Sequence, residues 1–97
     1  MNIQKMLQEA ASKLQKKMNE FENESFDFNY KELVKFKISG KFVISDLWIS
    51  PDLIDKDDPE TLQDVMALAV NEAYKDVEQK KEGIQNSLSR SMTKGFF

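Results

Sequence analysis

The chain contains no cysteine and no histidine. Without cysteine it can form neither a disulfide nor a thiolate metal site. Without histidine it has no imidazole ligand for zinc and no serine–histidine or cysteine–histidine catalytic pair. It also lacks the side chain that most often acts as a general base near neutral pH. These absences disfavour an enzyme, and we expect no cofactor and no small-molecule substrate.

Glycine and long apolar runs are also scarce. The three glycines form no glycine-rich phosphate-binding loop. The longest apolar run is only a few residues, so no segment is expected to span a membrane. Residues 1–5 carry no apolar signal core, and we therefore expect a cytoplasmic protein.

The 97 residues are 40% apolar and 32% charged, which is typical of a soluble globular protein. A chain of this length forms one domain with a thin core. We expect a single domain over residues 1–97, with 92–97 as a flexible tail.

The net charge of −3 conceals an uneven distribution. Residues 51–72 carry one lysine against seven acids, whereas residues 1–23 sum to +1 and residues 73–97 to +2. The acidic total argues against a polycation wrapped on nucleic acid. It is compatible with a local basic patch, because the field near a phosphate depends mainly on nearby charges.

The apolar spacing changes along the chain from helical to strand-like and back. Apolar residues at helical spacing predict a first helix over about 2–22, with Asn2 as its N-cap. Alternating residues then predict three short strands, 26–30, 34–38 and 42–49. Together with a long second helix, they predict an α+β fold with the order α-β-β-β-α and an antiparallel three-stranded meander.

Within the predicted sheet, Val34 and Ile38 should face the core while Lys35 and Lys37 face away from it. Lys31-Glu32 is expected to form the first turn. The second turn contains Gly40, which can adopt a positive φ. Trp48 is expected on the less buried face.

The second helix has a strong start signal. Asp58 can cap it, and Pro59 fits its first position. Apolar residues continue to about Met92, so the helix would be roughly 50 Å long, longer than a domain of this size is wide. Its far end must therefore project, break or lie on another chain, and Gly83 is the expected weak point because it costs about 1 kcal/mol relative to Ala.

The acids before this helix have a structural explanation. Asp55, Asp57 and Asp58 alternate loosely as calcium ligands do, but the segment has no glycine and Pro59 begins a helix. We assign these acids to helix capping and solvation, and we expect no metal site and no catalytic carboxylate pair.

Two groups of basic residues remain. Lys13, Lys16 and Lys17 lie off the apolar stripe of the first helix, and Lys80, Lys81 and Arg90 are spread along the far part of the second. A solvated charged surface explains both groups, and so does a phosphate-binding surface.

Four segments resemble the YbaB/EbfC family of bacterial nucleoid-associated DNA-binding proteins. Residues 33–40 (LVKFKISG) are similar to the family pattern LVKVxxNG, and residues 47–54 (LWISPDLI) are similar to VxIDPxLL. Residues 57–73 resemble DD…L…AxNDA, and residues 6–18 resemble LMKQAQKMQxKM. The chain departs from the family at residues 28–32, which replace a glycine-rich turn, and at Ser50, which replaces an aspartate.

This resemblance implies a homodimer with projecting C-terminal helices that binds duplex DNA in the nucleoid, with a chromosome-organising or gene-regulatory role. The family's helical DNA-binding regions correspond here to Lys13, Lys16, Lys17, Lys80, Lys81 and Arg90, which would contact phosphate. The alternative is a small acidic dimeric protein-interaction module, similar to a secretion chaperone, without DNA binding. Salt-sensitive retention on duplex DNA would separate the two.

Overall fold

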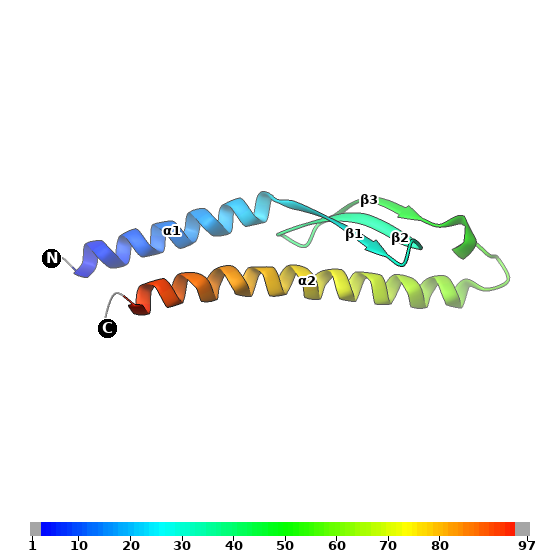
Figure 1. Cartoon of the computed structure of the whole chain (residues 1–97). Helices are drawn as coiled ribbons and strands as arrows, with labels where there is room; N and C mark the ends of the chain where they lie inside the picture. The colour runs from blue at the N-terminus through cyan, green and yellow to red at the C-terminus, as the bar shows by residue number, and fades with distance from the viewer. Residues whose placement is uncertain (1–2, 95–97) are drawn as a thin grey trace.

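The computed structural model describes residues 3–94, with the side chains up to residue 87. The molecule is a rod of 69 × 22 × 16 Å in which a long C-terminal helix runs the whole length, with a small sheet beside one half of it and the first helix beside the other (Figure 1). The elements in chain order are α1 (Ile3–Asn23), β1 (Ser25–Tyr30), β2 (Val34–Ser39), β3 (Ile44–Ile49), the 3₁₀ helix η1 (Pro51–Leu53) and α2 (Pro59–Lys94). The predicted α-β-β-β-α order is confirmed.

The sheet is an antiparallel meander in the order β1-β2-β3. Val34 pairs with Tyr30 on one side and with Ile49 on the other, and Lys35 pairs with Trp48. The predicted alternation in β2 is confirmed, because Val34, Phe36 and Ile38 are buried and both lysines are exposed. Trp48 lies on the outer face opposite Lys35, as its position in the strand predicted.

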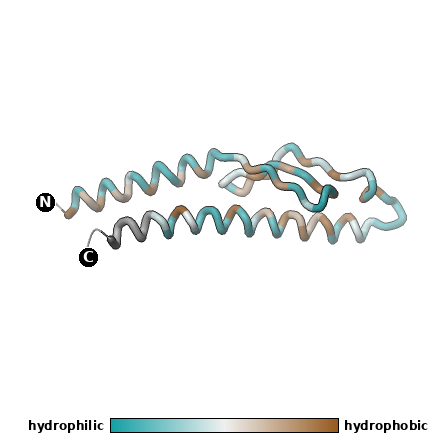
Figure 2. The backbone as a smooth tube through the Cα atoms, in the orientation of Figure 1, coloured by the Kyte–Doolittle hydropathy of each residue, from teal (hydrophilic) through white to brown (hydrophobic). Residues whose placement is uncertain are grey.

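The core lies between the inner face of the sheet and the middle of α2. Ala69, Ala73 and Val77 of α2 are completely buried, together with Val34 of β2. The two alanines bring the helix backbone close to the sheet, and the larger residues of β2 fill the remaining space. The brown segments of the tube in Figure 2 include this part of α2 and the strands that it covers.

α1 is anchored to this core only at its C-terminal end. Phe21 is its one buried residue in the described part of the chain. The apolar stripe of the preceding turns remains largely exposed, with accessible fractions of 60% for Ile3, 46% for Leu7 and 36% for Leu14. α1 therefore projects from the sheet beside the far half of α2 (Figure 1).

The first turn forms without glycine. Lys31 and Glu32 both have positive φ, 51° and 61°, and the amide of Leu33 donates to the carbonyl of Tyr30 at 2.8 Å. Positive φ at both central residues of this tight turn suits the twist of the two strands, and Leu33 completes the loop, because Tyr30 pairs with Val34. The side-chain oxygen of Asn29 accepts from the Glu32 amide at 3.0 Å and helps to hold this conformation.

The second turn differs from the prediction in two ways. Gly40 does not adopt a positive φ; it is required because a Cβ would overlap the backbone of Phe21. The third strand begins at Ile44 and not at residue 42, since Phe42 has a φ of 65° and belongs to the turn. The Ser39 hydroxyl accepts from the amides of Lys41 and Val43, both at 3.2 Å, which favours the turn over a longer strand.

α2 begins as predicted. It starts at Pro59, and Asp58 accepts from the amide of Thr61 at 3.3 Å and from its hydroxyl at 2.6 Å. Its 36 residues correspond to about 54 Å of helix, and it continues without a break through Gly83. α2 does not break at Gly83 but extends past the sheet, where it lies beside α1; contact of this end with another chain stays a prediction. The helix also extends to Lys94, into the segment predicted as a tail; residues 95–97 and the predicted cap Asn2 lie outside the described residues.

Candidate nucleic-acid interface

The lysines of α1 lie on its exposed surface. Lys13, Lys16 and Lys17 are all exposed, on the helix that projects from the sheet. Among the residues with described side chains, neither Lys13 nor Lys16 has a carboxylate within 4.0 Å, and Lys17 approaches Glu20 only at 4.0 Å. These ammonium groups are therefore available to an anionic partner.

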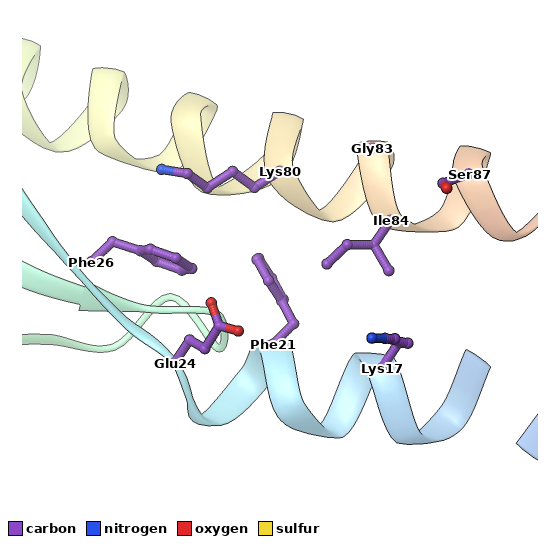
Figure 3. A pocket seen from close by; sticks show the side chains of 8 residues that line it. All are labelled: Lys17, Phe21, Glu24, Phe26, Lys80, Gly83, Ile84 and Ser87. Atoms are coloured by element: carbon purple, nitrogen blue, oxygen red, sulfur yellow. The ribbon is translucent and has the colours of Figure 1, made fainter. Parts of the chain in front are cut away.

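A groove separates α1 from α2 at the point where the helices leave the sheet (Figure 3). It encloses about 510 Å³ and is lined by Lys17, Phe21, Glu24, Phe26, Lys80, Gly83, Ile84 and Ser87. Phe21 points into it from α1 and Ile84 from α2 (Figure 3). Lys17 and Lys80, which are far apart in the sequence, thus line the same groove from opposite helices.

The basic residues of α2 are less available than those of α1. Lys80 is paired with Asp76 at 2.7 Å and lies over the ring of Phe26, 4.6 Å from its centroid. Lys81 is half-buried. The side chain of Arg90 lies outside the described side chains, so its predicted role stays a prediction. The i,i+4 spacing of Asp76 and Lys80 is a signal in the sequence that could have indicated this pairing.

The lysines on the outer face of the sheet are compensated by acids. Lys35 pairs with Glu32 at 2.7 Å and lies over Trp48, and Lys37 is 3.6 Å from Asp46. The hydrogen bond from Lys35, a further one from Asn29 and the positive charge of Lys35 lower the pKa of Glu32 below its usual value. This face is therefore a network of paired charges and attracts an anion less than α1 does.

The acidic segment lies at the opposite end of the rod from the projecting helices. It occupies η1, the following loop and the start of α2, at the right of Figure 1, whereas α1 and the end of α2 lie at the left. Residues 51–72, with one lysine against seven acids, therefore occupy one end of the molecule, whereas α1, with four lysines against three glutamates, lies at the other.

The sequence of the chain matches the model of the YbaB/EbfC DNA-binding family over residues 1–92. The chain belongs to the YbaB/EbfC DNA-binding family. It is 40% identical to a nucleoid-associated protein of Ureaplasma urealyticum over the full length of both chains. A nucleoid-associated protein of Malacoplasma penetrans is 40% identical over 87% of this chain and 93% of its own length. A nucleoid-associated protein of Lactococcus lactis is 39% identical over 84% of this chain and 87% of its own length.

Within residues 3–94, no three acidic side chains lie close enough together to hold a metal ion. No helix of the described part combines the length and the apolar character needed to cross a membrane.

Sequence reasoning missed the groove between α1 and α2. The groove depends on how two helices distant in the sequence pack against each other, and no local pattern reports that. The excess length of α2 predicted that it extends beyond the sheet, and this length is the feature of the sequence that hinted at a groove there.

Proposed function

We propose that this protein binds duplex DNA as a homodimer, mainly through phosphate contacts from the lysines of α1. The observation that carries the proposal is the exposed position of Lys13, Lys16 and Lys17 on a projecting helix, at the end of the molecule opposite the acidic segment, where, among the described side chains, only Lys17 approaches a carboxylate, that of Glu20 at 4.0 Å. Lysine ammonium groups near the phosphate backbone release condensed counterions and give affinity that depends little on sequence.

The contributions of the remaining basic residues are ranked by their surroundings. Lys80 can reach a phosphate at the edge of the groove if it exchanges Asp76 for the phosphate, and Lys81 is half-buried beside it. We assign Lys80, Lys81 and Arg90 a supporting role next to the α1 cluster. Binding of this kind suits a chromosome-organising or gene-regulatory protein of the bacterial nucleoid.

The dimer is supported by apolar residues along one edge of the sheet. β3 is an edge strand; Leu47 within it exposes 50% of its surface, and Val43, just before it, exposes 59%. Beside them Phe42 stacks on Tyr74 of α2, with ring centroids 5.1 Å apart. Large apolar residues gathered at an edge strand are typical of a surface that another chain covers. A second copy on this edge leaves α1 of each chain projecting.

Gel-shift assays at several salt concentrations, combined with light scattering of the free protein, test this function. We expect a dimer mass and a shift of duplex DNA that weakens as salt increases. A folded protein that fails to shift duplex DNA even at low salt would contradict the DNA-binding proposal and favour the acidic interaction module. A compact monomer at micromolar concentration would contradict the dimer.

A further inference from the structure

α1 carries a flank of neutral polar residues that phosphate binding does not use. Gln8, Ser12, Gln15 and Asn19 follow a 4-3-4 spacing, which places them along one side of the helix. All four are exposed. Lys13 and Lys17 fall on the opposite flank of the exposed surface, and Lys16 lies on the crest between the two.

The chemistry of this flank differs from that of a charged surface. An amide side chain offers donors and acceptors at fixed separation, and glutamine or asparagine can bond both N6 and N7 of adenine in the major groove. That groove is about 12 Å wide and admits an α-helix. A helix held by a phosphate contact of Lys16, on the crest, presents the neighbouring amide flank to the base edges.

The amides of Gln15 and Asn19 are already oriented by each other. Nε2 of Gln15 donates to Oδ1 of Asn19 at 3.0 Å. This bond leaves the Gln15 carbonyl oxygen as an acceptor and the Asn19 amide hydrogens as donors. Together the two side chains present both donors and acceptors to a partner. Because they already hold each other in place, they lose less conformational entropy on binding.

We propose that Gln8, Ser12, Gln15 and Asn19 form a base-reading flank that selects adenine-containing sites in the DNA major groove. The proposal rests on the DNA binding proposed above and adds direct readout of bases to it. The ligand is duplex DNA, because the chain belongs to a DNA-binding family and the lysines of the same helix complement phosphate.

The test is selection of bound sequences from a randomised duplex about two helical turns long, followed by titration of the enriched duplex. The parent protein should bind the enriched duplex about 5- to 150-fold more tightly than unselected DNA for each amide–adenine pair. Replacing the adenines of that duplex by 7-deazaadenine removes the N7 acceptor and should abolish the preference.

The variant Gln8→Ala/Gln15→Ala should lose about 5- to 150-fold of this preference for each adenine contact that it removes. Alanine favours the helix, so a loss of folding is not expected. Gln63→Ala is the matched control, since this exposed glutamine lies near the acidic end of α2. It should retain the parent's preference.

The outcomes separate this inference from the proposed function. If the parent does not bind duplex DNA, the proposed function fails. If it binds with a steep salt dependence but enriches no sequence, the base-reading flank is wrong and phosphate binding stands. If the double variant or the 7-deazaadenine duplex keeps the full preference, the preference arises elsewhere and the inference is again overturned.

Discussion

Gly40 lies so close to Phe21 that a β-carbon on Gly40 would overlap the carbonyl oxygen of Phe21. The Gly40 amide also donates to the carbonyl of Glu24 at 3.1 Å. The turn between β2 and β3 is thus fitted against the last turn of α1. Because Phe21 is the one buried residue of α1 in the described part of the chain, this packing fixes the direction in which the lysine-bearing helix projects.

We expect Gly40→Ala to destabilise the protein by about 1–3 kcal/mol, since the conflict is with backbone and cannot be relieved by a side-chain rotation. Gly83→Ala is the matched control. A β-carbon at Gly83 would meet no atom within 4 Å, and alanine favours a helix interior by about 1 kcal/mol. Thermal or urea unfolding of both variants measures the difference. A Gly40→Ala protein as stable as the parent would show that the turn does not fix α1.

The Lys31-Glu32 turn predicts a stabilising substitution. Lys31 has a φ of 51°, a conformation that asparagine tolerates better than lysine. We expect Lys31→Asn to raise the free energy of unfolding by about 0.5–1 kcal/mol, less the small stabilisation that the Lys31 ammonium gains over the Tyr30 ring. Lys41→Asn places the same change at an ordinary φ, where an effect within about 0.5 kcal/mol is expected. Equal effects in urea unfolding would argue against a strained turn.

The lowered pKa of Glu32 predicts a pH dependence of stability. A carboxyl whose pKa is depressed on folding stabilises the protein above its unfolded value, near 4.5, and this contribution disappears as the pH falls through the folded value. Glu32→Gln should therefore lower the melting temperature near neutral pH but not in strong acid. Lys35→Gln removes the main partner of Glu32. In that background, Glu32→Gln should lower the melting temperature near neutral pH by less. A difference in melting temperature between the parent and Glu32→Gln that stays the same at all pH values would refute this contribution of Glu32.

The edge of β3 provides the test of the dimer interface. Leu47→Glu places a charge among the exposed apolar residues of this edge and should shift the protein toward monomer, because a buried unpaired charge is costly. Ser45→Glu is the control in the same strand, on the outer face opposite Lys37. Light scattering at several concentrations reports the mass. A dimeric Leu47→Glu protein would place the interface elsewhere.

Much of the fold could be predicted from the sequence because the period of its apolar residues changes clearly. The alternation around Val34 and Lys35 determined the register, and Asp58 with Pro59 marked the start of α2. The role of Gly40 and the late start of β3 could not be predicted, since they depend on the backbone of Phe21 and on the stacking of Phe42 against Tyr74.

The candidate site was predictable to a similar extent. Exposure of Lys13, Lys16 and Lys17 follows directly from their positions off the apolar stripe, and the structure confirms it. The place of Lys17 and Lys80 on one groove does not follow from any local pattern, because it depends on the packing of α1 against α2. Contact of these lysines with DNA remains a prediction.

The most direct test of the account is the salt dependence of DNA binding by the parent and by Lys13→Gln/Lys16→Gln/Lys17→Gln, measured by fluorescence anisotropy on one labelled duplex. The parent should show a log–log slope of about −0.9 for each neutralised phosphate. The triple variant should stay folded, bind more weakly and have a slope that is shallower by a similar amount for each phosphate it no longer neutralises. A folded triple variant that binds as tightly as the parent at every salt concentration would show that α1 does not carry DNA binding.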